Sequence, residues 1–414
     1  MGLIDFFRRS EPSQARVEPS LQAASSVEST TQWSNGFITP GMATAGVRVD
    51  ESTVIGLPGT LQALRVLCGV FAMTPLVYYR RDGEGRTPAR GNILYDLLRV
   101  AANGHQSAFH FRELMMGDIL LAGEFNAYVS RDRLGRPVAL TRLRPGTCTP
   151  ALYFSAAEGE TVFYDATLPD GHSARFSGRD ILHIVGLSRD GLNGMNPIRY
   201  AREALGGAIA TERHAQRFWA RGGKVDTVLQ GKGRISRENK AVMREDWARL
   251  YGNPEATNVA VLDQDVTAQF LNSDHQKQQF LETRGYQLGD LARIWGVPPH
   301  LIFDLSKATF SNIEQQSLEF LTYHLGPHFE RVSSAITMRL AEADHFAEHL
   351  TDALVKGDLK SRMEAYWLQR QMGMVSADEL RQRDNIKPIG GAAGTTYWRP
   401  GNMVDAAEPV PGTP

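Results

Sequence analysis

Cysteine is almost absent from this chain, whose 414 residues include only Cys68 and Cys148. Two cysteines cannot build a disulfide framework, so the sequence favours a reducing compartment, with both thiols as small buried groups. Net charge is almost absent too, because 45 basic residues are balanced by 46 acidic ones. Such a chain does not hold nucleic acid through an overall positive field, so any contact with DNA must be local.

Long apolar runs are missing. The most apolar region, 61–79, is interrupted by Gln62, Arg65 and Pro75, which makes it a poor membrane-spanning helix. The first residues, MGLIDFFRRS, lack an apolar run followed by a small-residue cleavage site, so we expect no signal peptide. The sequence predicts a soluble protein without a membrane partner.

Motifs for nucleotide chemistry are missing as well. Residues 231–233 lack the upstream glycine and downstream hydroxyl of a Walker loop, and 191–194 is too short for a dinucleotide fingerprint. We therefore expect no nucleotide hydrolysis, no cofactor and no catalytic residue.

One segment leaves an enzymatic alternative open. Residues 345–349, HFAEH, match the H-x-x-E-H spacing of inverted zinc peptidases. On a helix, His345 and His349 would share a face and hold Zn²⁺, with Glu348 as the base. The other interpretation is a pair of solvated histidines on an amphipathic helix that binds no metal.

Apolar residues make up 42% of the chain, which is enough for two or more packed units. Residues 1–45 and 392–414 contain few large apolar side chains, and we expect both ends to be flexible. The turns at Gly135, Gly159 and Gly171 predict an antiparallel meander. Helices are expected at 61–72, 93–100 and 108–121, and strands at 76–80, 126–131, 139–144, 151–154, 161–165, 174–176 and 181–184. The pattern indicates an α+β fold.

A long helix is predicted to begin at Pro197, with Asn196 as its cap, and to end before Gly222. At about 100° per residue its basic side chains share one face; they are Arg199, Arg202, Arg213, Arg217 and Arg221. Three uses stay open for this stripe: pairing with acidic groups of an adjacent subunit, contact with DNA phosphates, or a solvated face. Pairing between subunits is favoured, with Asp274, Glu282 and Asp290 as candidate partners.

A small insert follows this helix. We expect a helix at 236–251 and strands at 227–230, 259–262 and 267–270, after which the chain re-enters a helix at 274–295. Two long helices that flank a small αβ insert indicate a stalk that carries a head.

Residues 296–316 read GVPPHLIFDLSKATFSNIEQQ. Pro298 and Pro299 restrict the backbone, and the next helix begins near Ser311. The segment between them is a loop with apolar residues beside Lys307. It is either an ordinary buried connection or a loop that contacts a partner physically, without catalysing a reaction.

Together with FRELMMGDILLAGEFNAYV (111–129), ILHIVGLSRDGLNGMNPI (181–198) and LETRGYQLGDLARIWGVPP (281–299), this loop resembles the portal proteins of tailed bacteriophages, specifically the HK97-type family. The resemblance extends from about 58 to about 391. Phages, prophages and gene transfer agents carry this family. It implies a portal-like α+β fold divided into an N-terminal arm (1–45), wing (46–196), first stem helix (197–223), clip (224–273), second stem helix (274–296), tunnel loop (297–310), tunnel helix (311–343), crown (344–391) and tail (392–414).

The resemblance also implies a function. Portal proteins form a ring, usually of twelve subunits, at one capsid vertex of the virion, and double-stranded DNA passes through it without sequence-specific binding. The implied partners are the major capsid protein, the terminase large subunit and head-completion or adaptor proteins, with assembly in the host cytoplasm. The implied tunnel-loop residues are Leu301, Phe303, Leu305, Ser306, Lys307 and Thr309, and the implied partner-docking residues of the clip are Arg234, Arg237, Lys240 and Arg244. Alternatives are the zinc hydrolase and a capsid-associated structural protein without a channel.

Overall fold

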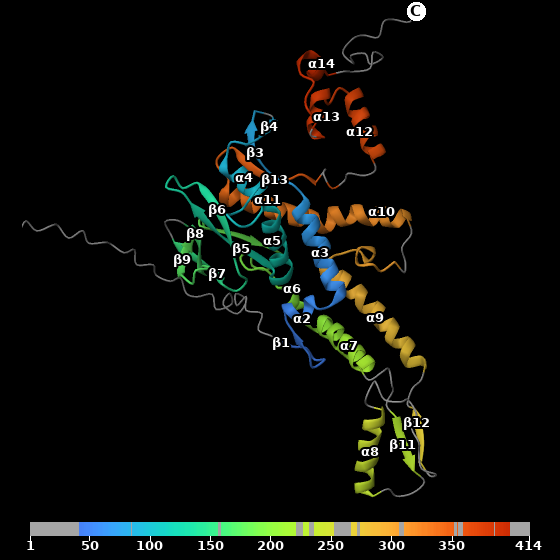
Figure 1. The fold of residues 1–414 in the computed structure, drawn as a ribbon. Helices are drawn as coiled ribbons and strands as arrows, with labels where there is room; N and C mark the ends of the chain where they lie inside the picture. Colours follow the sequence, from blue (N-terminus) through green and yellow to red (C-terminus); the bar gives the residue numbers. More distant parts are fainter. Residues whose placement is uncertain are drawn as a thin grey trace, which may run out of the picture. The chain divides into compact units, whose positions relative to one another are not determined.

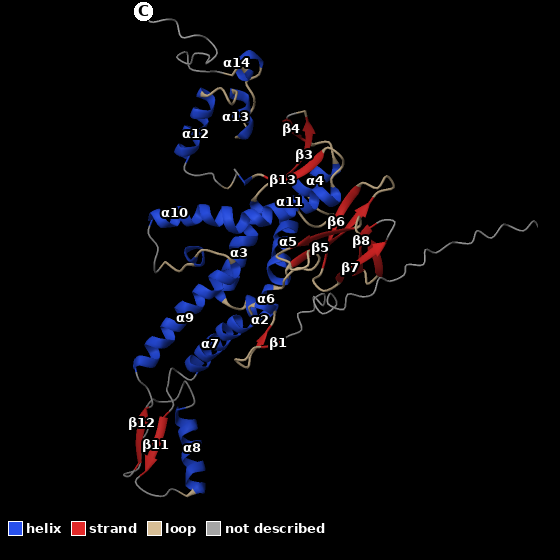
Figure 2. Cartoon of the chain, turned by 180° about the vertical axis from the view of Figure 1, so that it is seen from behind, coloured by secondary structure: helices blue, strands red, loops and turns tan. Residues whose placement is uncertain are grey.

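The computed structural model describes residues 41–83, 85–155, 159–220, 227–231, 236–251, 266–270, 274–305, 310–351, 354, 359–384 and 386–397. Helices and antiparallel strands follow one another along the chain (Figures 1 and 2), which confirms the predicted α+β class. The chain divides into two compact units. The first contains the described residues up to Met73 and Tyr78–Glu348, and the second contains Thr74–Val77 and the residues from His349 onward.

The labels in Figure 1 denote the following elements. The strands are β1 (Gly41–Met42), β2 (Arg48–Val49), β3 (Leu76–Asp82), β4 (Gly85–Pro88), β5 (Glu124–Arg131), β6 (Pro137–Leu143), β7 (Cys148–Ser155), β8 (Gly159–Thr167), β9 (Ser173–Ser177), β10 (Ile181–Val185), β11 (Thr227–Gly231), β12 (Val266–Phe270) and β13 (His345–His349). The helices are α2 (Glu51–Ile55), α3 (Pro58–Met73), α4 (Ile93–Arg99), α5 (Ala108–Ala122), α6 (Pro197–Tyr200), α7 (Arg202–Ala220), α8 (Arg237–Tyr251), α9 (Asp274–Trp295), the 3₁₀ helix η1 (Pro299–Ile302), α10 (Phe310–Glu319), the π-helix η2 (Phe320–Leu325), α11 (Gly326–Leu340), α12 (Leu359–Gln371), α13 (Ala377–Arg383) and α14 (Gly391–Thr395).

Helix α5 lies at the centre of the first unit. Ser107 caps it as predicted, because its side chain accepts the His110 N–H at 3.2 Å. The buried Arg112 side chain of α5 donates to the carbonyl oxygens of Ala72 and Leu98, which close α3 and α4. These carbonyls have no partner within their own helices, so one arginine satisfies the ends of two helices and joins them to a third. Burial lowers the pKa of Arg112 to about 10.

Two three-stranded antiparallel sheets follow α5, with strand orders β10-β5-β6 and β7-β8-β9. The hairpin turns predicted at Gly135, Gly159 and Gly171 are present, each with a positive φ. Strands β7, β8 and β9 form the predicted antiparallel meander, but the strands do not all belong to one sheet, because β10 pairs with β5 rather than with β9. Their shared core contains Leu143, Cys148, Tyr164, Ala166 and Ile181. Both cysteines of the chain are free and buried, as predicted.

The H-x-x-E-H segment forms strand β13, so both sequence-based interpretations that place His345 and His349 on a helix are wrong. Strand β13 joins the sheet β13-β3-β4, where the His345 ring stacks on Tyr78 with centroids 5.1 Å apart. Glu348 instead pairs with Arg86 of β4. In a strand, alternate residues point to opposite faces, and residues four apart lie roughly 13 Å apart. His345 and His349 therefore cannot share a metal ion with Glu348 beside it. No cluster of three metal-ligating side chains occurs among the described residues.

The long helices lie close to their predicted positions. The helix expected from Pro197 is interrupted at Ala201, so α6 and α7 are separate, while α9 covers nearly the whole of 274–296. The helix expected over 311–343 runs as α10, η2 and α11. Pro327 lacks the N–H that an unbroken α-helix would need there, and the wider π turn directly before it provides the local adjustment.

Residues 41–45 belong to a short β1–β2 hairpin, so the predicted flexible arm is wrong at its C-terminal end. Residues 1–40, 221–226, 398–414 and the predicted strand at 259–262 lie outside the described residues. No helix of the described chain has the length and apolarity that crossing a membrane requires.

Candidate assembly and channel surfaces

Helices α7 and α9 form a pair held by polar contacts. The Gln287 side chain of α9 donates to Thr211 Oγ1 at 2.7 Å and to the Gly207 carbonyl at 3.3 Å. Arg284, one turn earlier in α9, forms an ion pair with Glu212 of α7, with 3.0 Å between Nη2 and Oε2. These contacts place Glu212 and Arg284 at the same level along the two helices. The carboxylate of Glu212 is therefore committed to a partner within the chain.

The β1–β2 hairpin packs on another face of α7. Thr44 donates its backbone N–H to Glu203 Oε2 at 3.0 Å. The hairpin approaches so closely that a Cβ added at Gly206 would overlap the Ala43 side chain. Glycine at this position is required by the close approach of the two segments. The hairpin thus covers α7 at Gly206, where the side chains of Ala43, Val47 and Val49 lie closest.

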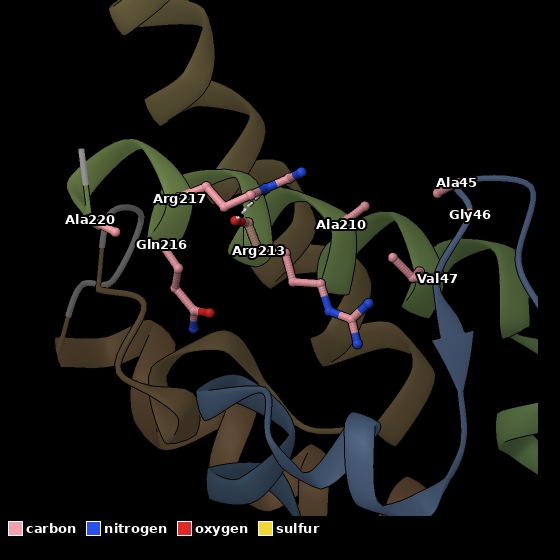
Figure 3. A pocket seen from close by; sticks show the side chains of 8 residues that line it. All are labelled: Ala45, Gly46, Val47, Ala210, Arg213, Gln216, Arg217 and Ala220. Carbon is pink, nitrogen blue, oxygen red and sulfur yellow. Dashed lines mark hydrogen bonds between the residues drawn. The ribbon is translucent and has the colours of Figure 1, made fainter. Parts of the chain in front are cut away.

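Beyond the hairpin, α7 borders a hollow of about 610 Å³ (Figure 3). Its lining residues are Ala45, Gly46, Val47, Ala210, Arg213, Gln216, Arg217 and Ala220. Figure 3 shows the Arg213 and Gln216 side chains extending to the same side of α7, while Arg217 lies along the helix, where its Nε donates to the Arg213 carbonyl at 3.3 Å. The lining thus combines small apolar side chains with two cations. Such a surface suits an acidic side chain on a compact segment.

The predicted arginine stripe does not form one continuous surface. Arg199 is exposed on α6, and Arg202 is half-buried with its guanidinium beside Gly41 of the hairpin. Arg213 and Arg217 are exposed, and neither has an ion-pair partner among the described residues. Arg221 lies outside those residues. Of the four stripe arginines in the described part of the chain, the hollow brings together two, Arg213 and Arg217.

The predicted tunnel loop is firmly anchored where it leaves α9. Gly296 has φ 65°, and a Cβ there would lie 2.8 Å from His324 Nδ1. The Gln62 side chain donates to the Leu301 carbonyl at 3.3 Å, and His300 Nδ1 lies 2.9 Å from Gln316 Oε1 of α10. Ile302 is buried in this anchor. The base of the loop is thereby fixed to α3, α10 and η2.

Beyond the anchor the side chains face outward. Phe303 is 78% exposed and Leu305 is 59% exposed. Phe303 also has φ 64°, a left-handed conformation that costs free energy for any residue with a Cβ. Ser306, Lys307 and Thr309 lie outside the described residues. Of the six predicted loop residues, Leu301 thus helps to anchor the loop, and Phe303 and Leu305 are presented on its surface.

Two of the segments that carry the family resemblance, 111–129 and 181–198, contact each other closely through glycine residues. Gly186 donates its N–H to the Gly123 carbonyl at 2.9 Å, and a Cβ on either Gly186 or Gly194 would collide with that oxygen. The Gly194 N–H in turn donates to Glu124 Oε2 at 3.1 Å. Burial opposes ionisation of Glu124, but His183 and the Gly194 N–H outweigh it and lower the pKa of the carboxyl. This contact fixes the loop from which α6 begins.

The basic residues predicted for partner docking lie on α8. Arg237, Lys240 and Arg244 are exposed there, and Arg234 lies outside the described residues. Because they recur at spacings of three and four residues, the three cations follow one face of the helix.

Two features of the site escaped sequence reasoning. The β1–β2 hairpin was missed because its small residues resemble a disordered segment. The adjacent glycines Gly206 and Gly207 in the middle of a helix were the available signal, since glycine is unfavourable there unless another segment needs the space. Tyr286, which is 67% exposed on α9, was also missed.

Comparison with known proteins identifies the family. The profile of the Phage portal protein family matches residues 60–385. The portal protein of Enterobacteria phage HK97 is 28% identical over 352 residues, which are 83% of this chain and 82% of the relative. The probable portal protein of Streptomyces phage phiC31 is 34% identical over 241 residues, 56% of this chain and 53% of that protein. The chain therefore belongs to the phage portal protein family.

Solved structures support the same fold. An HK97-family portal protein from Corynebacterium diphtheriae has a TM-score of 0.54 at 17% identity, covering 75% of this chain and 98% of that one. A chain from the neck of an empty gene transfer agent particle, computed with C6 symmetry, has a TM-score of 0.57 at 21% identity, covering 81% and 92%. A chain from the neck of the native particle, computed with C12 symmetry, has a TM-score of 0.54 at 20% identity, covering 81% and 92%. The fold is that of HK97-type portal proteins.

Proposed function

We propose that this portal protein assembles into a ring of twelve copies around one hollow axis, and that the ring forms the channel for double-stranded DNA at a capsid vertex. The family match over 60–385 carries the proposal, because it spans nearly all the described chain. In this assignment α6, α7 and α9 are the stem, 224–273 is the clip, 46–196 is the wing, α10 to α11 is the tunnel helix and the residues from 344 to 391 are the crown.

The exposed side chains that follow the anchored residues 296–302 are suited to a loop that lines a channel. Phe303 and Leu305 place apolar surface beyond a fixed base, so twelve loops would surround the duplex without holding its phosphates. The near balance of 45 basic and 46 acidic residues fits this role, because each neutralised phosphate adds affinity through counterion release and a basic lumen would slow the DNA. Lys307 would contact a phosphate only transiently.

The proposed partners follow from the ring. The wing contacts the major capsid protein, and Arg237, Lys240 and Arg244 of the clip present a basic face to the terminase large subunit and later to head-completion or adaptor proteins. ATP hydrolysis is assigned to the terminase, so this subunit is structural and not an enzyme. The ring assembles in the host cytoplasm and remains in the virion.

Negative-stain electron microscopy of the purified protein tests the proposal. We expect rings with a central hole. A monomer or a compact aggregate under all assembly conditions would contradict it, and would favour a capsid-associated structural protein without a channel.

A further inference from the structure

The second unit of the chain contains a helix whose apolar side chains face solvent. We propose that the outer side of α12, around Trp367 and Leu368, packs against the segment 386–390 of a neighbouring copy of this chain. The inference rests on the proposed ring, because each copy in a ring has an identical neighbour on either side, and it names one contact between neighbours.

The second unit provides almost no core for α12. From 363 onward, the buried residues of the described chain are only Val375, Ser376 and Gly394, and none of them belongs to α12. A helix of 13 residues is marginal in water unless one of its faces packs against another surface. Helix α12 therefore needs a surface that the described part of its own unit does not supply.

Polar contacts mark the inner side of α12. Tyr366 donates its hydroxyl hydrogen to Asp384 Oδ1 at 3.4 Å, and Arg383 Nη1 donates to Gln369 Oε1 at 3.0 Å. Figures 1 and 2 show α12 and α13 side by side. The side of α12 that carries Tyr366 and Gln369 therefore faces the C-terminal end of α13.

The outer side of α12 is apolar. At about 100° per residue, Trp367 and Leu368 lie about 130° from the middle of the inner side, one in each direction. Trp367 is 62% exposed, Leu368 is 57% exposed and Met363 is 42% exposed. Glu364 lies on this side too, but it already interacts within the chain. The outer side thus offers a partner mainly apolar area, which is the reverse of the pattern expected for a helix at the surface of an isolated unit.

A second apolar surface follows α13. The Asp378 carboxylate accepts the N–H groups of Ile389 and Gly390 at 2.6 and 2.9 Å, and Ile386 donates its N–H to the Arg381 carbonyl at 2.7 Å. These bonds fix the backbone of the segment, while the Ile386 and Ile389 side chains are 48% and 56% exposed. A fixed backbone with β-branched side chains loses little conformational freedom on binding. The segment is therefore suited to pack against the large apolar side chains of α12.

The two apolar surfaces lie on different sides of α13. Arg383 contacts α12, whereas Asp378 and Arg381 hold the segment 386–390. By the same helical rule, Asp378 and Arg381 lie about 140° and about 200° around α13 from Arg383. One unit therefore cannot bring its own two surfaces together.

A neighbouring copy satisfies both surfaces at once. Every chain exposes one surface of each kind, so equal copies cover all of them, whereas a separate partner would cover only one kind. Because the two surfaces differ, the contact is head-to-tail and repeats around a ring.

Photocrosslinking from α12 tests the contact. Leu368→Cys is labelled with benzophenone maleimide, and the native Cys68 and Cys148 are buried and should stay unlabelled. Rings formed from equal amounts of isotope-labelled and unlabelled chains are irradiated and digested, and mass spectrometry identifies the joined peptides. We expect peptides that contain 386–390, in pairs that mix the two isotopes. Ala365→Cys is the matched control, because it is exposed on α12 nearer the inner side, and it should lose most of this product.

An exchange of charge tests the same contact energetically. Leu368→Lys alone or Ile389→Glu alone would bury an unpaired charge at every contact, so each should lower the protection of the α12 amides against hydrogen exchange in rings roughly tenfold or more. Both changes in one chain place a lysine opposite a glutamate at each contact and should restore the protection. Restoration also shows that neither change prevents folding.

Products that join α12 to 41–348 or to 398–414 would identify another surface of the chain as the occupant and overturn the inference. Pairs of one isotope only, no product with 386–390, or full protection of both single variants would also overturn it. The proposed function would stand in each case while negative-stain images show rings with a central hole. Absence of rings from the unaltered protein would contradict the proposed function and this contact with it.

Discussion

The indole of Trp295 donates from Nε1 to Thr60 Oγ1 across 3.2 Å, and both residues are buried. This hydrogen bond joins the last turn of α9 to the first turn of α3, directly before the proposed channel loop begins. A helix that could bend here would change the position of Phe303 and Leu305. The bond therefore helps to fix the base from which the loop extends.

Thr60→Val should lower the free energy of unfolding by about 1–3 kcal/mol, because it removes the acceptor at nearly constant volume and leaves the buried indole N–H without a partner. Urea denaturation measures this loss. The control is Thr322→Val at an exposed position of η2, which should change stability little. Thr337 is unsuitable as a control, because its side chain accepts a hydrogen bond from Ala347 of another element. Equal stability of Thr60→Val and the parent would show that the bond contributes nothing.

Gly206→Ala and Gly207→Ala should have opposite effects, although the two glycines are adjacent in α7. At Gly206 the new methyl would overlap Ala43 and force the β1–β2 hairpin away, at a cost of about 1–3 kcal/mol. At Gly207 no atom lies within 4 Å of the added Cβ, so alanine should stabilise the helix by about 0.5–1 kcal/mol. Thermal unfolding of both variants checks the sign. Equal effects would mean that the hairpin does not pack on α7.

Asp190 should make the loop before α6 sensitive to acid. Burial opposes its ionisation, but hydrogen bonds from Asn193, Leu192 and Ser188 outweigh that effect and lower its pKa from 3.8 to about 2. A lowered pKa in the folded state means that the stabilisation is present above about pH 4 and is lost as the pH falls toward 2.

The contribution is modest because Asp190 is mostly exposed, where solvent screens its interactions. The difference in unfolding free energy between the parent and Asp190→Asn should shrink between about pH 5 and about pH 3. A difference that stays constant over this range would show that the carboxylate is not held in its ionised form.

Phe303→Gly should separate assembly from passage of DNA. Glycine adopts the positive φ without strain, so the variant should be at least as stable as the parent. Its rings should form normally, whereas packaging or retention of DNA should fall because the exposed aromatic ring is gone. Deletion of 306–309 should act in the same direction. Met338→Ala, which removes another exposed apolar side chain, serves as the control. Normal packaging by both loop variants would remove the loop from the mechanism.

Local signals in the sequence predicted much of the fold. Ser107, Asn196 and Pro197 mark helix starts by chemistry that acts within a few residues, and those helices begin where expected. The errors fall where distant segments decide the structure. Residues 345–349 have no local feature that forbids a helix, and they become a strand because β3 provides a partner far away in the sequence. The pairing of β10 with β5 is similarly non-local.

The candidate site was predictable only in part. The apolar character of Phe303 and Leu305 is visible in the sequence, whereas their exposure depends on the anchor made by Gln62, His300 and Gly296. The arginine stripe was visible as a helical pattern, but helical periodicity does not reveal that the hairpin covers Arg202 and leaves Arg213 at the hollow.

A reconstruction of the assembled ring by electron cryomicroscopy would show which residues surround the axis. We expect a central hole wide enough for duplex DNA, with its narrowest part formed by the segment after Ile302, including Phe303 and Leu305. A ring in which this segment lies on the outer surface, or an assembly without a hole, would contradict it.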